Sequence, residues 1–400
     1  MGHREAAGRT LPFVLGVYAA SRLLYFAAGA IMARTLPISS FQRRTSDVPY
    51  GRLNTWSHWD GEHYIHLAAS GYLNPPYDES PAFFPLYPLL VRALDSLFGG
   101  PVSLPALGVW GVIVSLAALP FALYFVYRLA EDAGGPRTAR ASVLVLAFFP
   151  TAFFLNAVYT ESLFLALSAG ALWAVRVRKN LLLACVLAGL ACATRNVGIF
   201  LLVPLALEWL RRRREYGLRG AACLALAPSG LLLYAAYLWW RFGNPLLFYT
   251  GQRRWGREPT GPLHALVTAF EQAGRGLAQL SGMRPGAGSG SLMDHLAATN
   301  ETYNLLFLLL ALTLLVAGAR SLPPGMSAYA FLLVAVPALF GTPQDPLMGM
   351  PRFVLVAFPI FITLGALVGK RKVALRLWLA VNIAFSLFLC ALFVSWRFVA

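Results

Sequence analysis

Long apolar runs alternate along the chain with short polar or basic segments. The hydrocarbon core of a bilayer is about 30 Å thick, so an α-helix needs roughly 20 apolar residues to cross it. We interpret as spans the runs at 11–33, 105–128, 221–241, 302–319, 352–369 and 374–395, with a shorter one at 326–341. The first run is longer than a signal-peptide core and is interpreted as a retained span. The pattern predicts an all-α polytopic membrane protein.

Two longer apolar regions, 141–176 and 181–210, carry polar residues near their middle, Glu161 in the first and Arg195 in the second. If each is a helical hairpin, the chain makes eleven crossings and every lysine falls on the same side as the N-terminus. If either were a single span, the basic clusters at 176–179 and 211–214 would lie on opposite sides. Because cytoplasmic loops are enriched in Lys and Arg, we predict about 11 transmembrane helices with a cytoplasmic N-terminus.

This arrangement places two long loops, 34–104 and 242–301, and three short turns, near 157–161, 195–196 and 342–351, outside the membrane. Nearly every unusual polar residue of the chain lies on this side. We therefore predict one integral membrane domain over 1–400, in the plasma membrane of a bacterium, with an extracytoplasmic active site.

Composition supports a membrane protein and excludes a soluble one. The chain is 58% hydrophobic and 12% charged, whereas soluble domains are about 45–50% apolar and 25% charged. The formal net charge is +16, but the basic residues lie between apolar runs and form no basic domain. Membrane lipids are thus the expected partners, and nucleic acid is not. The four cysteines fall inside apolar runs and are expected to pack as small apolar residues.

The first outer loop contains the main candidate for catalysis, Asp60, in the segment Trp56–Tyr64. Trp59 and Tyr64 flank it with aromatic rings that can contact a sugar or line an apolar groove. A partly desolvated carboxylate has a raised pKa and becomes a better general base. Competing carboxylates are Glu62, Glu161 and Asp345.

Three histidines surround Asp60. His63 and His66 are three residues apart, and His58 with Asp60 could complete a divalent metal site. Hydrogen bonding to substrate or backbone is the favoured role for His58 and His63, and no metal ligand is predicted.

Further charged residues at the outer rim are candidates for donor binding. Arg195 and Arg352 suit a phosphate diester, because the guanidinium fork matches phosphate oxygens; the alternative for Arg195 is an arginine that snorkels to the interface. Glu161 is either a site residue or simply an acid in the first turn of a helix. Gln252 and Arg253 supply donors in the second outer loop.

Several short stretches resemble one known family, in family order and over most of the chain. They are Trp59–Tyr64, Phe83–Pro88, Phe149–Phe154, Tyr159–Phe164, Thr194–Arg195, Gly243–Pro245 and Pro351–Phe353. Together they resemble the GPI mannosyltransferase 2 (PIG-V-like) family of GT-C glycosyltransferases, in its shorter prokaryotic form. The family's usual Pro-Arg-Tyr is Pro-Arg-Phe here.

The resemblance implies a GT-C-like helical bundle with a structured first outer loop. It also implies inverting transfer of mannose from a polyprenyl-phosphate (dolichyl-phosphate-type) donor to a lipid or glycan acceptor. Asp60 is then the base, and Arg195 and Arg352 hold the donor phosphate. The alternative is a lipid-linked saccharide transporter or flippase without transferase activity. Transporters place ionisable groups near the bilayer midplane, whereas these lie at one rim, which favours the enzyme.

Overall fold

The computed structural model describes residues 2–39, 54–73, 80–280, 292–297 and 299–399. The first half of the chain contains α1 (Gly2–Thr35), η2 (Asn54–Trp56), α2 (Asp60–Ser70), η3 (Ser80–Ala82), α3 (Leu86–Phe98), α4 (Leu104–Ala147), η4 (Ala152–Asn156), α5 (Glu161–Arg176), α6 (Leu181–Thr194) and η5 (Asn196–Leu201). The second half contains α7 (Leu202–Arg211), α8 (Arg213–Leu224), α9 (Ser229–Phe242), α10 (Leu247–Thr250), η6 (Gly251–Trp255), β1 (Glu258–Pro259), α11 (Pro262–Leu280), α12 (Leu292–Ala297), α13 (Asn300–Gly318), α14 (Pro324–Ala338), β2 (Phe340–Gly341), α15 (Met350–Val356), α16 (Pro359–Val368) and α17 (Lys372–Val394).

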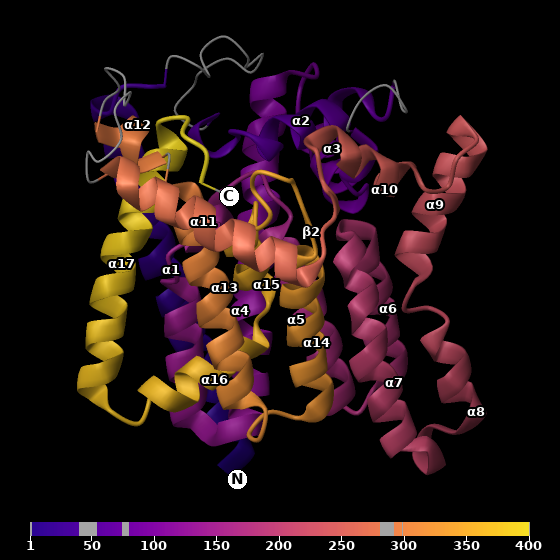
Figure 1. Cartoon of the computed structure of the whole chain (residues 1–400). Coiled ribbons are helices and arrows are strands. Elements are labelled where there is room, and N and C mark those ends of the chain that lie inside the picture. The colour runs from indigo at the N-terminus through magenta and orange to yellow at the C-terminus, as the bar shows by residue number, and fades with distance from the viewer. Residues whose placement is uncertain (1, 40–53, 74–79, 281–291, 298, 400) are drawn as a thin grey trace.

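The prediction of an all-α polytopic membrane protein is confirmed. Five helical segments of the described chain are long and apolar enough to cross a bilayer, and a sixth is counted if the bent pair α15–α16 is one span. The helices stand side by side in one bundle (Figure 1). The number of eleven crossings stays a prediction.

The longest helix, α4, joins the predicted span 105–128 to the first arm of the predicted hairpin. Gly135 interrupts it with a φ of 77°, a left-handed conformation that glycine adopts without steric cost. Pro136 follows and has no N–H to continue the hydrogen-bond ladder. At this kink the chain reverses direction, at the end of the bundle that holds the N-terminus, so the two parts of α4 before and after Gly135 are separate helices.

The α-helix is interrupted in the middle of both predicted hairpins, as expected. Residues 148–160 form turns and the short η4, and α5 then begins at Glu161. In the second hairpin, α6 ends at Thr194 and η5 precedes α7. These breaks bring Glu161 and Arg195 to the same end of the bundle.

The predicted single span at 352–369 is wrong in shape. Residues 350–368 form two helices, α15 and α16, which are bent by 78° at the break between them. Pro359 is the first residue of α16. An N–H at this position would have no partner within α16, so the proline costs that helix nothing, but a proline cannot donate the hydrogen bond that would continue α15. The bend places α15 so that its Arg352 reaches Asp60 at the start of α2.

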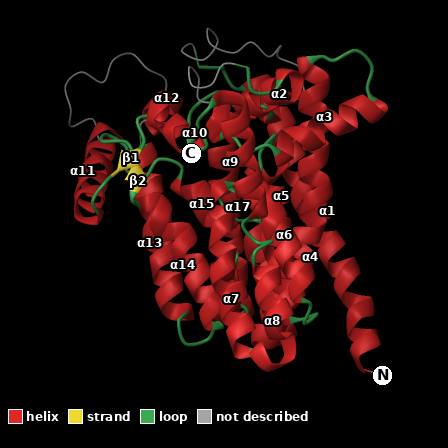
Figure 2. Cartoon of the chain, turned by 90° about the vertical axis from the view of Figure 1, so that its right-hand side faces the viewer, coloured by secondary structure: helices red, strands yellow, loops and turns green. Residues whose placement is uncertain are grey.

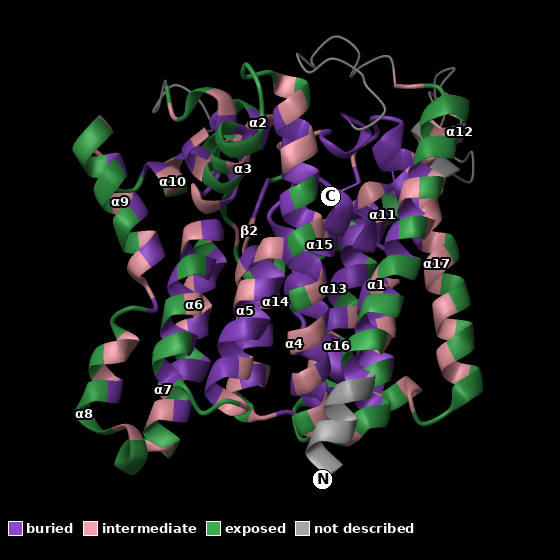
Figure 3. Ribbon diagram, turned by 180° about the vertical axis from the view of Figure 1, so that it is seen from behind, coloured by how far each residue is buried: buried purple, intermediate pink, exposed green. Residues whose placement is uncertain are grey.

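The core lies where α4 packs against α5 and α16, and buried residues line the facing sides of these helices (Figure 3). Gly365 of α16 permits a close approach to α4. A Cβ added there would lie 2.6 Å from the backbone nitrogen of Ser142 in α4. Small residues at such contacts let helix backbones approach closely in membranes.

The two ends of the bundle differ. The helices α2, α3, α11 and α12 gather at one end, and the N-terminus with the α7–α8 and α16–α17 connections lies at the other (Figures 1 and 2). The antiparallel pair β1–β2, with Glu258 opposite Gly341, ties the segment after α9 to the segment before α15. Residues of distant segments therefore meet at the end that holds α2.

Candidate functional site

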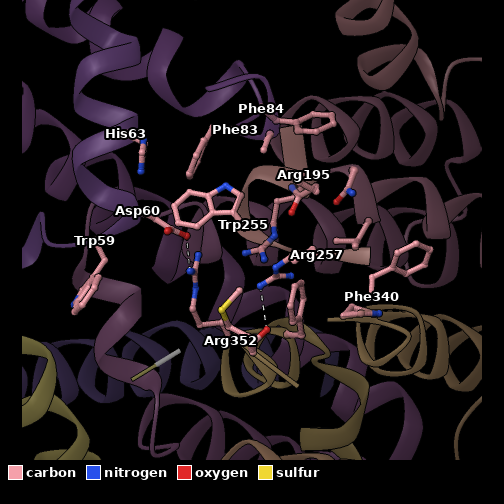
Figure 4. A pocket seen from close by; sticks show the side chains of 18 of the residues that line it. Trp59, Asp60, His63, Phe83, Phe84, Arg195, Trp255, Arg257, Phe340 and Arg352 are labelled. Carbon is pink, nitrogen blue, oxygen red and sulfur yellow. Dashed lines mark hydrogen bonds and ion pairs between the residues drawn. The ribbon is translucent and has the colours of Figure 1, made fainter. Parts of the chain in front are cut away.

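A cavity of about 570 Å³ opens at the α2 end of the bundle. Its walls come from α2, the segment before α3, the α6–η5 junction, η6, α14, α15 and the residues after α17. Of the residues predicted from sequence, seven line it: Trp59, Asp60, His63, Tyr64, Arg195, Gln252 and Arg352 (Figure 4).

Asp60 is the first residue of α2 and presents its carboxylate to the cavity with 27% of the side chain exposed. Arg352 Nη1 donates to Asp60 Oδ2 at 2.6 Å. Burial alone would raise the pKa of Asp60, but the Arg352 guanidinium and the nearby His63 and Arg257 outweigh it and lower that pKa. Asp60 is consequently ionised at neutral pH.

Glu161 does not line the cavity and lies fully buried behind it. Its Oε1 accepts from Arg352 Nε at 2.7 Å and from Arg195 Nη1 at 2.9 Å. Two arginines from distant helices are thus fixed by one acid, which goes beyond a local helix-terminus role. The first turn of α5 holds the acid because the segment 148–160, which is not α-helical, ends there.

The Arg352 fork is shared between two carboxylates. Nη1 contacts Asp60 and Nε contacts Glu161, and the guanidinium lies 4.5 Å from the centre of the Tyr159 ring. In this structure the Arg352 guanidinium is therefore paired with two carboxylates and holds the Asp60 side chain in place. Binding of a donor phosphate by Arg352 stays a prediction.

Arg257 is a cavity-lining residue that the sequence analysis missed. It follows η6, and its Nη2 donates to the Met348 carbonyl at 3.0 Å. It forms no ion pair with any described residue, and burial lowers its pKa to about 10. The ring of Phe353 lies between it and Arg195, at 5.8 and 5.5 Å from the two guanidinium carbons. The phenylalanine of the Pro-Arg-Phe stretch therefore contacts both cations.

Besides Glu161, two more of the predicted binding residues lie outside the cavity. His58 is buried, with its ring 3.9 Å from that of Trp396 and Nδ1 3.2 Å from the Phe393 carbonyl. Burial lowers its pKa to about 3, so it is neutral. Arg253 is exposed on η6 and does not contact the cavity. Direct donor contacts by these two residues are not supported by the geometry.

Aromatic rings form much of the cavity wall. His63 stacks on Phe83 at 4.6 Å and meets the edge of Trp255 at 5.5 Å. Trp396 and Phe398, which follow α17, complete the wall beside Trp59. These two were missed because nothing in their local sequence indicates a return to the first outer loop.

The described residues hold no group of three or more His, Cys, Asp or Glu that could bind a metal. His66 is exposed and His58 is buried under Trp396, so the three histidines do not converge.

A family model described as mannosyltransferase (PIG-V) matches residues 8–208, half of the chain. The chain belongs to this family. Asp60, Glu161 and Arg195 lie inside the matched half, whereas Arg257 and Arg352 lie beyond it.

Curated relatives of this PIG-V family chain share a short region with it. Human GPI alpha-1,6-mannosyltransferase 2 is 32% identical over 132 residues, which are 30% of this chain and 25% of the human protein. GPI mannosyltransferase 2 of Drosophila pseudoobscura pseudoobscura is 33% identical over 113 residues, 27% of this chain and 24% of the fly protein. The match spans about a quarter of the length of these relatives.

Among solved structures, ArnT from Cupriavidus metallidurans bound to undecaprenyl phosphate overlays with a TM-score of 0.46 and 13% identity. The overlay covers 89% of this chain and 60% of ArnT. The Archaeoglobus fulgidus oligosaccharyltransferase overlays with a TM-score of 0.39 and 14% identity, over 96% of this chain and 55% of that protein.

Proposed function

We propose that this protein is an inverting glycosyltransferase that transfers mannose from a polyprenyl-phosphate donor to an acceptor hydroxyl on the extracytoplasmic face. Membership of the mannosyltransferase family supports the reaction class. The observation that carries the proposal is one cavity holding an ionised carboxylate, Asp60, and a guanidinium without an acidic partner in the described chain, Arg257.

Asp60 is the base in this proposal. The acceptor oxygen attacks the anomeric carbon while its proton passes to Asp60. The bond from that carbon to the phosphate oxygen breaks on the opposite face, and its electron pair stays with the phosphate. Arg352 keeps Asp60 ionised and fixes its Oδ2, at 2.6 Å. Asp60 is therefore deprotonated at neutral pH, although it is a weaker base than a carboxylate with a raised pKa would be.

Arg257, with Arg195 beside it, is assigned to the donor phosphate. A guanidinium suits phosphate oxygens, and a cation preset where negative charge develops on the leaving group stabilises the transition state. Apolar residues of the cavity wall nearby, Val336 and Pro337, belong to α14, and Val197 belongs to η5. They offer a path for the polyprenyl chain between two segments of the bundle.

The first prediction concerns Asp60→Asn, which keeps the shape of the side chain but cannot accept the proton. General base catalysis contributes about 10²–10⁴-fold, so mannose transfer should fall by at least about 100-fold. The measurement is transfer from saturating polyprenyl-phosphate-mannose to an acceptor-lipid extract by the purified protein. Binding of the donor should be retained, because the phosphate contacts lie elsewhere.

Glu62→Gln is the matched control, because Glu62 also lines the cavity and lies two residues after Asp60 in α2. It should keep most of the activity. An active Asp60→Asn protein beside a dead Glu62→Gln protein would overturn the assignment of the base. A parent protein that moves lipid-linked sugars across vesicles without any transfer would instead support a flippase.

A further inference from the structure

A second cavity, of about 200 Å³, lies between α5, α7 and the start of α14. The helices α5 and α7 both end beside it, at Arg176 and Arg211. It is at the end of the bundle that holds the N-terminus and the α7–α8 connection, opposite the cavity around Asp60 (Figure 1). The proposed function makes no use of this second cavity.

Charged and apolar residues of this cavity lie at different depths. Arg176 and Arg211 line it, and so do Leu172 and Leu207, which precede them by four residues in the same two helices. Residues four apart in an α-helix share a face and are about 6 Å apart along the axis. The cavity therefore has a basic mouth at the end of the bundle and an apolar interior one turn deeper.

Two carboxylates near this mouth already have partners. Asp132 accepts from Arg176 Nη2 at 2.8 Å, and Glu208, which lines the cavity, pairs with Arg212 Nε at 3.2 Å. Arg211 forms no ion pair or hydrogen bond with any described residue. Of the four consecutive arginines 211–214, only Arg211 lines the cavity. Its positive charge is thus left for a partner from outside the chain.

The side of the cavity between α7 and α14 is closely packed. A Cβ added to Gly325 would lie 3.1 Å from the Cα of Pro204, so the two backbones nearly touch there. Pro323 and Pro324 restrict φ where the chain enters α14, and Met326 behind them is 1% exposed. Backbone contacts and prolines therefore define this wall.

We propose that the second cavity binds an anionic phospholipid. The phosphate lies at Arg211 and Arg176, because a guanidinium matches phosphate oxygens. The first part of an acyl chain lies against Leu172 and Leu207. Basic pockets between membrane helices suit acidic headgroups, whereas a free phosphate ion would leave the apolar interior without a partner. This proposal is independent of the proposed function.

The test measures thermal unfolding of the purified full chain in a mild detergent, because a ligand that binds the folded state raises the Tm. The probe is phosphatidylglycerol. Phosphatidylcholine, which carries no net charge, and inorganic phosphate, which has no acyl chain, are the comparison ligands. Phosphatidylglycerol should raise the Tm at lower concentration than phosphatidylcholine, and inorganic phosphate at the same concentration should leave it unchanged.

Two variants test the charge and the shape of the cavity separately. Arg211→Gln should raise the Kd for phosphatidylglycerol about fivefold, the loss expected for one basic residue near an anionic headgroup. Arg214→Gln is its matched control, because it removes the same charge from the same exposed run outside the cavity, and its Kd should equal that of the parent. Leu207→Trp narrows the interior and leaves every charge in place, so it should also weaken binding.

The remaining outcomes contradict the proposal. Equal weakening by Arg211→Gln and Arg214→Gln would mean that the basic run attracts acidic lipid without a site. An equal effect of phosphatidylcholine, or a Kd unchanged in Leu207→Trp, would show that no acidic lipid enters the cavity. Arg211 is exposed and Leu207 is 42% exposed, so both variants should fold, and their Tm without added lipid checks this.

Discussion

Arg352 determines the electrostatics of the candidate base. Its guanidinium contacts Asp60 and Glu161 at 2.6 and 2.7 Å, and its charge outweighs the burial that would otherwise raise the pKa of Asp60. A base is active in its deprotonated form. The lowered pKa therefore predicts that transfer is independent of pH from neutral down to the ordinary titration range of aspartate, near pH 4.

The second prediction is that Arg352→Gln moves the acid limb of the pH–rate profile to higher pH. Without the guanidinium, burial dominates and the pKa of Asp60 rises, so protonation inactivates the base at a higher pH than in the parent. Arg352→Lys should shift the limb less, because the charge remains but an ammonium lacks the planar fork that serves both acids. The measurement is residual transfer against pH, scaled to the plateau of each variant.

Arg253→Gln is the control for this shift, since Arg253 lies exposed on the same η6 segment as the cavity residue Gln252 but outside the cavity. Its profile should match that of the parent. An Arg352→Gln profile with an unmoved acid limb would mean that Asp60 is not the titrating group.

Residue types and spacing were sufficient to select Asp60, Glu161, Arg195 and Arg352, because each stands in a polar stretch beside an apolar run. The structure unites them through ion pairs. The partner of each charge was not predictable, since it depends on how distant helices meet. Arg257 was missed for the same reason, although it lies only four residues beyond Arg253, which was singled out in the second outer loop.

At the scale of the helices, the break between α4 and α5 depends on one buried arginine of α1. Arg22 is 4% exposed. Its Nη1 donates to the Ala152 carbonyl at 3.1 Å and to Asn156 Oδ1, and its Nη2 donates to the Ala147 carbonyl at 3.3 Å. These acceptors lie at the end of α4 and in the break, where helical bonds are missing. Arg22 thus supplies donors to acceptors that the end of α4 and the break leave without α-helical partners.

The third prediction is that Arg22→Met destabilises the protein by roughly 2–4 kcal/mol, because each buried acceptor left without a donor costs about 1–3 kcal/mol. Thermal unfolding in detergent measures it. The stability of the Arg22→Lys protein should lie between those of the parent and Arg22→Met proteins, since lysine keeps three N–H donors but places them differently from a guanidinium. Arg128→Met is the control: its ion pair with Glu131 is partly exposed and is worth about 0–1 kcal/mol. Equal stability of the Arg22→Met and parent proteins would refute this account of the break.

Element boundaries were predictable where proline or charge interrupts an apolar run. The breaks in the α-helices near Glu161 and Arg195 are confirmed, and each contains a short 3₁₀ helix. The 78° bend between α15 and α16 was not predictable, because hydropathy shows that both helices are apolar but gives no information on the direction of either helix.

For the whole molecule, the distribution of charge predicts an orientation. The connections that carry the clusters at 211–214 and 370–372 lie at the end of the bundle that holds the N-terminus (Figure 1), whereas the cavity around Asp60 is lined by residues of α2 at the other end. The positive-inside rule therefore predicts that the N-terminal end faces the cytoplasm and that this cavity faces outward. A membrane-borne donor with its sugar outside reaches Asp60 only in this orientation.

The last prediction tests the orientation with single cysteines placed in a background that lacks the four native ones. Ser70→Cys and His264→Cys, both exposed at the cavity end, should react with an impermeant maleimide on intact cells. Arg213→Cys, exposed at the α7–α8 junction, should react only after permeabilisation. Labelling of position 213 on intact cells together with protection of 70 and 264 would reverse the bundle. The carboxylate of Asp60 would then face the cytoplasm, and an extracytoplasmic transferase would be ruled out whatever its activity in detergent.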